Sequence, residues 1–259
     1  MKRKPVPTGF ITASALLALF VILPLLATLF STRPGELGQT LTDPEVSRSI
    51  GLTFGAGGIA TGLGLLGGVP LAYLLARYRF HGKRALQALV DLPIVIPHTA
   101  AGVALLMVFG RQGLLGRPLA ELGLFFTDSL GGIVVAMMFV SLPYLVNASR
   151  DAIELVDEEM ERVALIDGAS AWQAFWLVTL PQAWRGVAGG ALMMWARGVS
   201  EFGAVVILAY HPKIVPVLVY ERFEGFGLKT ALPVAVLLIL AAVVMFGLLR
   251  WLLTPEREK

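Results

Sequence analysis

The sequence predicts an all-α polytopic membrane protein with six transmembrane helices and a polar cytoplasmic loop. Three observations lead to this prediction. Of the 259 residues, 56% are hydrophobic and only 15% are charged, and the mean hydropathy is +0.76. A soluble chain of this length would still need a charged shell. Here the hydrophobic residues form long runs, and one polar stretch (161–181) lies between two of them.

Six apolar runs are long enough to cross a hydrocarbon core, which takes roughly 20 helical residues. They are residues 10–30, 50–76, 86–109, 130–147, 187–209 and 232–253. The first run follows Lys2, Arg3 and Lys4, as a secretory signal would. It is longer than the apolar part of most signals, and no good small-residue cleavage site follows it. We therefore expect a membrane anchor there.

The distribution of Lys and Arg predicts the orientation of the chain. If the N-terminus is cytoplasmic, the inner segments carry 13 basic residues and the outer loops carry 7. Inner segments of membrane proteins are enriched in these residues. Both termini and the 161–181 stretch are therefore expected in the cytoplasm.

The second and third runs contain residues that alter helix packing. Glycines at four-residue spacing, as in Gly51-x-x-x-Gly55, allow helices to approach closely. Ordinary packing of helices in a bundle explains these glycines. The alternative is that this helix slides or rotates against its neighbours. Pro93 and Pro97 each remove a backbone donor, so the third span must kink or be interrupted. Such bends are common beside a translocation path, and the candidates there are Pro93, Pro97, His98 and Thr99.

The polar stretch predicts two short helices joined at an elbow. Asp157 is a candidate N-cap of the first helix, and Gly168 is suited to end it in a left-handed conformation. Ser170 and Gln173 have the spacing of a capping box that starts a second helix, and Pro181 follows about three turns later. Such a unit is a rigid lever for a cytoplasmic partner.

The same stretch resembles the EAA loop of ABC importer permeases, in which a coupling helix docks into a groove of the ATP-binding subunit. The resemblance implies that contact with the ATPase involves Glu161, Arg162, Ala164, Asp167, Gly168, Leu180 and Pro181. Glu161, Ala164 and Gly168 share one helix face. The family often has Glu or Ala where this chain has Arg162, Ala where it has Val163, and Ile where it has Val178. The contact chemistry therefore differs in detail.

Two further segments, 91–110 and 196–210, resemble permeases of molybdate/tungstate transporters. Sulfate permeases share much of the second segment, so a sulfate/thiosulfate permease is the alternative. The resemblance implies a type I importer permease fold. Its five-helix core would span 46–254, preceded by a tail, the first helix and an outer loop (1–45) and followed by a tail (255–259). It also implies a permease homodimer, two ATP-binding cassette subunits inside, and an external oxyanion-binding protein that sets selectivity.

Several chemistries are not expected of this chain. It has no G-x-x-x-x-G-K-[ST] motif, so ATP and Mg are expected on a separate subunit and no cofactor on this one. It has no cysteine, its three histidines lack metal-ligand spacing, and its basic residues form no face for nucleic acid. We expect a transport subunit, with no catalytic or metal site, in the lipid bilayer of the cell membrane.

Charged residues inside the spans are costly, so they usually pair or line a wet path. Arg197 and Glu201 lie four apart and could pair with each other. The alternative places Arg197, Ser200 and Glu201 on the path, where a fixed cation draws in a divalent oxyanion. Asp91 is expected near the membrane interface. The outer segment 211–227 has an apolar centre too short to span, and it could help to receive the binding protein.

Two other classes remain open. An ion-coupled secondary transporter needs no cytoplasmic helix pair and often has repeated halves, which this chain lacks. An intramembrane enzyme needs paired carboxylates, an activated nucleophile or a histidine cluster, and the spans contain only scattered polar groups.

Overall fold

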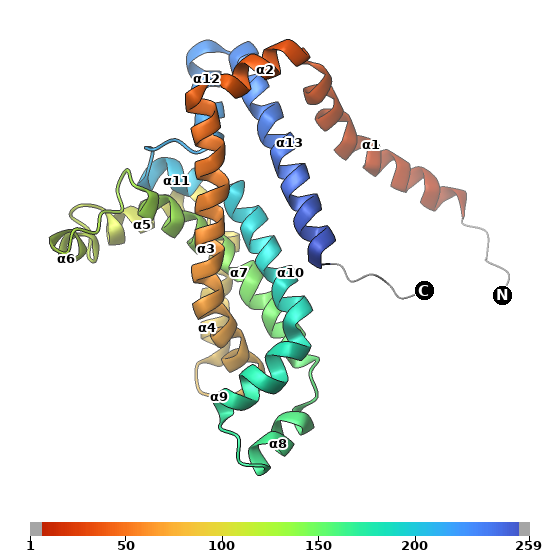
Figure 1. Cartoon of the computed structure of the whole chain (residues 1–259), viewed down its shortest axis with the longest axis vertical. Helices are drawn as coiled ribbons and strands as arrows, with labels where there is room; N and C mark the ends of the chain where they lie inside the picture. Colours follow the sequence, from red (N-terminus) through yellow and green to blue (C-terminus); the bar gives the residue numbers. More distant parts are fainter. Residues whose placement is uncertain (1–6, 254–259) are drawn as a thin grey trace.

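The computed structural model describes residues 7–253, and every regular element within that range is a helix. This confirms the all-α prediction. Figure 1 shows long helices running between two ends of the molecule. The helices α2 and α12 lie at one end, and α8 and α9 lie at the other.

The helices begin and end as follows. They are α1 (Thr8–Phe30), α2 (Pro34–Thr42), α3 (Pro44–Arg77), α4 (Lys83–Val95), α5 (His98–Phe109), α6 (Gly116–Glu121), α7 (Leu130–Glu154), α8 (Glu158–Ile166), α9 (Ala171–Ala174), the π-helical turn η1 (Phe175–Thr179), α10 (Leu180–Val199), α11 (Gly203–Leu208), α12 (Val215–Phe226) and α13 (Leu228–Leu253).

Four of the described helices are long and apolar enough to cross a membrane: α1, α3, α7 and α13. The α4–α5 pair makes a fifth span if it is counted as one, although the two helices are bent by 117° at their junction. The bend lies at Ile96 and Pro97, as the sequence predicts, because Pro97 has no N–H to continue the hydrogen-bond ladder of α4. The count of six spans is therefore not confirmed.

The predicted span over 187–209 differs from the structure. Its helix, α10, begins earlier, at Leu180, and ends at Val199. The helix is then interrupted before the short α11 begins at Gly203. Gln182, Arg185 and Arg197 make α10 more polar than the long spans. The hydropathy of the sequence predicted one continuous span because the apolar second half of α10 and the residues of α11 form a single hydrophobic run.

The centre of the bundle is α7, which packs against both α3 and α10. Within lipid, close packing rather than exclusion of water holds helices together, so small residues matter at the contacts. A Cβ atom on Gly57 of α3 would lie only 2.9 Å from the Val199 side chain, and one on Gly68 would lie 3.2 Å from Leu142. These glycines therefore set the distance of α3 from α10 and α7, which agrees with the bundle-packing interpretation.

Other glycines of α3 face away from the bundle. Space is open for 4 Å around the Cβ positions of Gly51, Gly55, Gly58 and Gly62, and all four residues are exposed. The apolar helix α1 likewise has no buried residue, and it diverges from the bundle in Figure 1. Within residues 7–253, the outer glycine face of α3 is thus exposed, and α1 makes only a small contact with α13.

Ion pairs fasten α12 to the start of α3. Arg222 lies 2.6 Å from Asp43, the N-cap residue of α3, and Lys213 lies within 3.1 Å of both Glu45 and Glu221. The predicted short outer segment is therefore a helix that packs on α13 and α3 at one end of the bundle.

Candidate functional site: a helical elbow and two broken helices

The first helix of the elbow, α8, begins as predicted. The Asp157 side chain accepts a hydrogen bond from the backbone N–H of Glu159 at 3.0 Å. The first turn carries Glu158, Glu159 and Glu161, where the positive end of the helix dipole favours negative charge. The cap and the acidic first turn therefore determine the residue at which this short helix begins.

The turn of the elbow also matches the prediction. Gly168 has φ = 96°, a left-handed conformation that favours glycine. The Ser170 hydroxyl accepts from the N–H of Gln173 at 3.2 Å, and the Gln173 side chain accepts from the N–H of Ser170 at 2.8 Å. This is the reciprocal capping box expected at the start of the second helix.

The second helix does not stop at Pro181, which corrects the expectation of two separate short helices. It passes from α9 through the π-helical turn η1 directly into α10, with Pro181 in the first turn of α10. The N–H of Leu180 bonds to the carbonyl of Phe175, five residues back. A π turn widens the helix just before the proline, which lowers the clash between its ring and the preceding turn. The elbow is therefore continuous with a core helix.

Glu161 points into the protein rather than outward with Gly168. Its side chain accepts from Arg77 Nε at 2.8 Å, from the Thr179 hydroxyl at 2.7 Å and from the Tyr73 hydroxyl at 3.1 Å. Only 8% of the residue is exposed. We name this group of Tyr73, Arg77, Glu161 and Thr179 the inner clamp. It joins α8 to the end of α3 and to the π turn.

The other predicted elbow residues lie closer to the surface. Arg162, Asp167, Gly168 and Pro181 are exposed, and Ala164 and Leu180 are half-buried. Arg162 contacts Glu158 and Glu159 at 3.2 and 2.6 Å, so its charge is shared along the outer side of α8. Ile166 is 83% exposed at the end of the helix. The outward side of α8 thus offers both charged and apolar groups.

A second polar cluster joins the two broken helices. Glu201 lies in the break between α10 and α11, is 1% exposed, and contacts Arg197 at 3.0 Å and His98 at 3.1 Å. Its other oxygen accepts from the N–H of Ala204, which caps α11. We name His98, Arg197 and Glu201 the junction cluster.

His98 contacts both members of the ion pair. Its Nδ1 lies 3.1 Å from the Glu201 carboxylate, and Arg197 Nη2 lies 3.0 Å from Nδ1 and 2.8 Å from Nε2. A Cβ on Gly203 would meet the Cβ of His98 at 2.7 Å, so a glycine is needed for the two breaks to approach this closely.

The structure separates the predicted path residues into two groups. His98, Arg197 and Glu201 come together, and the Ser200 hydroxyl lies 3.4 Å from Arg197 Nη1. Pro93 is buried within α4, whereas Pro97 and Thr99 are exposed at the start of α5. Asp91 accepts a hydrogen bond from Asn147 of α7 at 2.6 Å, which gives that carboxylate a partner inside the chain.

The sequence did not reveal the partners of Glu161, nor the role of His98 in the pairing of Arg197. Tyr73 and Arg77 lie 88 and 84 residues from Glu161, and His98 lies 99 residues from Arg197. One signal was available, since Arg77 is a charge in the last turn of a long apolar helix.

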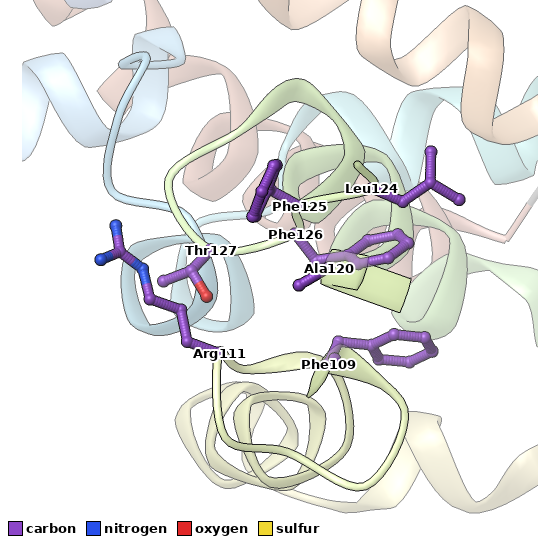
Figure 2. A pocket seen from close by; sticks show the side chains of 8 residues that line it. Phe109, Arg111, Ala120, Leu124, Phe125, Phe126 and Thr127 are labelled. Atoms are coloured by element: carbon purple, nitrogen blue, oxygen red, sulfur yellow. The ribbon is translucent and has the colours of Figure 1, made fainter. Parts of the chain in front are cut away.

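A cavity of about 400 Å³ lies apart from both clusters, beside α6. Figure 2 shows Phe109, Phe125 and Phe126 around it, with Arg111 and Thr127 at one side. None of the predicted site residues lines it. Within residues 7–253, no group of three or more His, Asp or Glu side chains is arranged to hold a metal ion.

Comparison with known proteins identifies the architecture. The family described as "Binding-protein-dependent transport system inner membrane component" matches residues 68–254. A molybdate/tungstate transport system permease protein, WtpB, of Pyrococcus furiosus is 41% identical over 99% of both chains. Its counterpart in Thermococcus kodakarensis is 45% identical over 83% of this chain and 82% of that one.

More distant relatives are also similar. A probable sulfate transport system permease protein of Zygnema circumcarinatum is 31% identical over 93% of this chain and 86% of that one. Among solved structures, a bacterial importer of the polysaccharide alginate has a TM-score of 0.74 at 17% identity, covering 95% of this chain and 94% of that one. At that identity the likeness concerns the fold alone.

Proposed function

Since the chain belongs to the family of binding-protein-dependent transport system inner membrane components, we propose that it is the permease subunit of an ATP-driven importer of molybdate or tungstate. The relatives named for molybdate and tungstate are 41% and 45% identical. The relative named for sulfate is 31% identical. This difference in identity supports molybdate or tungstate over sulfate as the substrate. Membership of this family also argues against an ion-coupled secondary transporter, which would need no relation to it.

The observation that carries the proposal is the elbow. Helix α8 protrudes at one end of the bundle (Figure 1), and its inward carboxylate is held by the inner clamp. Its outward side, from Arg162 to Gly168, is the proposed docking surface for an ATP-binding subunit. ATP and Mg would bind to that subunit, so this chain is a transport subunit rather than the ATPase.

We place the elbow and both chain ends on the cytoplasmic side. The Lys and Arg distribution favours this orientation. In Figure 1 the start of α1 and the end of α13 both lie away from the α2–α12 end, on the side towards the elbow. The α2–α12 end would then face outward and receive the external oxyanion-binding protein. That protein would set selectivity, because the spans offer few polar groups to recognise an oxyanion.

Two copies of the chain would form the permease. The exposed glycine face of α3 (Gly51, Gly55, Gly58 and Gly62) suits close approach of another helix. With one ATP-binding subunit per copy, the complex would have two elbows and two ATPases.

We propose that the translocation path passes the breaks in the α4–α5 and α10–α11 helices, near Pro93, Pro97, His98, Thr99, Arg197, Ser200 and Glu201. Non-helical backbone at membrane depth is tolerated where it lines a cavity or is buried in protein. The Arg197 charge is balanced by Glu201 at 3.0 Å. The cluster therefore serves mainly to hold the two breaks together, rather than to bind the anion tightly.

Co-purification and uptake together test this proposal. The chain, co-expressed with an ATP-binding cassette subunit, should retain that subunit through detergent purification. In vesicles that also receive the binding protein, uptake of molybdate or tungstate should depend on ATP. Retention of no ATPase, or uptake driven by an ion gradient without ATP, would contradict the proposal.

A further inference from the structure

We propose that a groove at the elbow end of the bundle binds an anionic membrane lipid, with one hydrocarbon chain along the groove and the phosphate at the α3–α4 turn. This site goes beyond the proposed function and does not depend on import of an oxyanion. The groove lies between α3 and the continuous helix of α9, η1 and α10. It consists of two adjoining hollows of about 360 and 270 Å³ that share Pro70, Trp172 and Phe175. We name it the aromatic groove.

Each wall of the aromatic groove is one face of a helix. Positions at helical spacing supply the α3 wall, namely Leu65, Leu66, Val69, Pro70 and Tyr73. The opposite wall consists of Trp172, Phe175, Trp176, Leu180, Trp184 and Val187. The rings of Trp172 and Trp176 meet edge to face with centroids 5.6 Å apart, and Phe175 lies 5.2 Å from Trp176. Such a lining suits a hydrocarbon chain rather than a polar ligand.

The tryptophans of the groove are open to their surroundings. Trp172, Trp176 and Trp184 are 59%, 47% and 55% exposed. Among residues 7–253, none of their indole N–H groups has a hydrogen-bond partner. Tryptophan is enriched at the membrane interface, where its ring lies in hydrocarbon and its N–H reaches polar groups. The ester and phosphate oxygens of a lipid would satisfy these donors, whereas an apolar helix from a second copy would offer no free acceptor.

Basic side chains lie at the elbow end of the groove. Tyr78 lines this end, and the next six residues include Arg79, Lys83 and Arg84. The N–H of Lys83 bonds to the carbonyl of Phe80 at 3.3 Å, so the chain turns tightly here. In the part of the chain that the structure describes, none of these three cationic side chains has an ion-pair partner. A cluster of unbalanced Lys and Arg at a membrane surface attracts anionic headgroups.

The length of the groove also fits a lipid. Residues 65–77 of α3 rise about 18 Å at 1.5 Å per residue. One leaflet of the hydrocarbon core is about 15 Å thick, half of the whole. The α3–α4 turn and α9 lie at the same end of the molecule in Figure 1. A lipid with its phosphate at this turn could therefore extend one chain along the groove to the middle of the bilayer.

Quenching of tryptophan fluorescence by brominated lipid chains measures occupation of the groove. Of the five tryptophans, three line the groove, Trp195 is buried and Trp251 is exposed elsewhere. The full chain with Trp251→Phe is placed in vesicles of phosphatidylglycerol and phosphatidylcholine, with bromine on the chains of one lipid or the other. In this background, Arg79→Gln/Lys83→Gln/Arg84→Gln neutralises the turn. The control, Arg111→Gln/Arg117→Gln, neutralises exposed basic residues beside α6.

We expect phosphatidylglycerol to quench with an apparent affinity at least about fivefold above that of phosphatidylcholine, which is the effect of about one basic residue near an anionic lipid. The triple variant should lose this preference, and the control should keep it. Equal quenching by both lipids without the charge variants would overturn the proposal, since the groove would then hold bilayer lipid without selection. No quenching by either would also overturn it, because protein, such as a second copy, would then cover the groove. A preference that survives in the triple variant would contradict a phosphate site at the α3–α4 turn.

Discussion

The carboxylate of Glu201 lies 3.0 Å from Arg197 although the two residues belong to different segments, Arg197 to the last turn of α10 and Glu201 to the break that follows. Glu201 also contacts His98, at the start of α5. One buried carboxylate thus holds together two helices that are each interrupted inside the bundle. Its loss should therefore affect the packing of both breaks.

The first prediction concerns this pair. Arg197→Gln alone leaves a buried carboxylate without its cation, and breaking a buried pair is strongly destabilising. Because His98 still contacts Glu201, we expect a loss of about 2 kcal/mol of stability. The double variant Arg197→Gln/Glu201→Gln should recover most of this loss. The thermal unfolding midpoint in detergent measures both, and a double variant no more stable than the single one would contradict the pairing.

Uptake by the same double variant decides between the two roles of Arg197. If the residue only balances Glu201, vesicles with the double variant should transport at close to the wild-type rate, and this is our expectation. A normally inserted and stable double variant that loses transport would instead place the Arg197 charge on the oxyanion path.

The second prediction concerns the approach of the two breaks. A Cβ on Gly203 would collide with His98 Cβ at 2.7 Å and lie 3.2 Å from the N of Thr99. Gly203→Ala should therefore cost about 1–3 kcal/mol through overpacking. Gly189→Ala, with open space around its position in α10, should be neutral or stabilising because alanine favours helix. The unfolding midpoint should fall in Gly203→Ala and should stay the same or rise in Gly189→Ala, and equal shifts in the two variants would be inconsistent with this close packing.

The third prediction concerns the elbow. Gly168 has φ = 96°, whereas proline fixes φ near −65°. Gly168→Pro should leave insertion of the spans intact but displace α8, so that the ATPase is released or hydrolyses ATP without transport. Gly123→Pro imposes the same strain at φ = 79° outside the elbow, and it should retain the ATPase. Normal transport by vesicles that carry Gly168→Pro would refute the role of the elbow.

The fourth prediction is a pH dependence at the α2–α12 end. The Arg222 guanidinium lowers the pKa of Asp43, and Lys213 lowers the pKa of Glu221. Glu221 in turn raises the pKa of Lys213. The stabilisation from the two carboxylates is present above their ordinary values, 3.8 and 4.5, and is lost as the pH falls through the lowered values. That from Lys213 is lost as the pH rises beyond 10.5.

Hydrogen exchange of α12 measures this dependence after correction for the intrinsic rate. Protection of α12 should be constant near neutral pH and should fall below about pH 4. Arg222→Gln should lower protection near neutral pH and shrink the acid loss, because the pKa of Asp43 then returns towards its ordinary value and contributes less pH-dependent stability. An unchanged profile in this variant would mean that the Arg222–Asp43 pair does not fasten α12.

The sequence predicted those features whose causes are local. The Asp157 cap, the left-handed Gly168 and the Ser170–Gln173 capping box depend on residues within four positions of one another. The bend at Pro97 depends on the backbone N–H that proline lacks. Each of these follows from backbone chemistry alone, and each is present in the structure.

Features that depend on distant partners were not predictable. Glu161 was expected to share one helix face with Ala164 and Gly168, but the direction of its side chain is set by Arg77 and Tyr73, more than 80 residues away. The prediction that α10 and α11 form one span was wrong for a similar reason. The break at Glu201 is stabilised by His98 from another helix, and the hydrophobic pattern of the segment does not indicate such a contact.

We propose that this chain moves molybdate or tungstate inward, with selectivity set by a separate binding protein and energy supplied by a separate ATPase. Uptake of labelled molybdate and tungstate by vesicles that contain the full complex tests this function most directly. We expect uptake only when ATP and the cognate binding protein are both present, with sulfate a poor competitor even in large excess. Equal competition by sulfate would favour a sulfate permease, and uptake without any binding protein would contradict the proposed function.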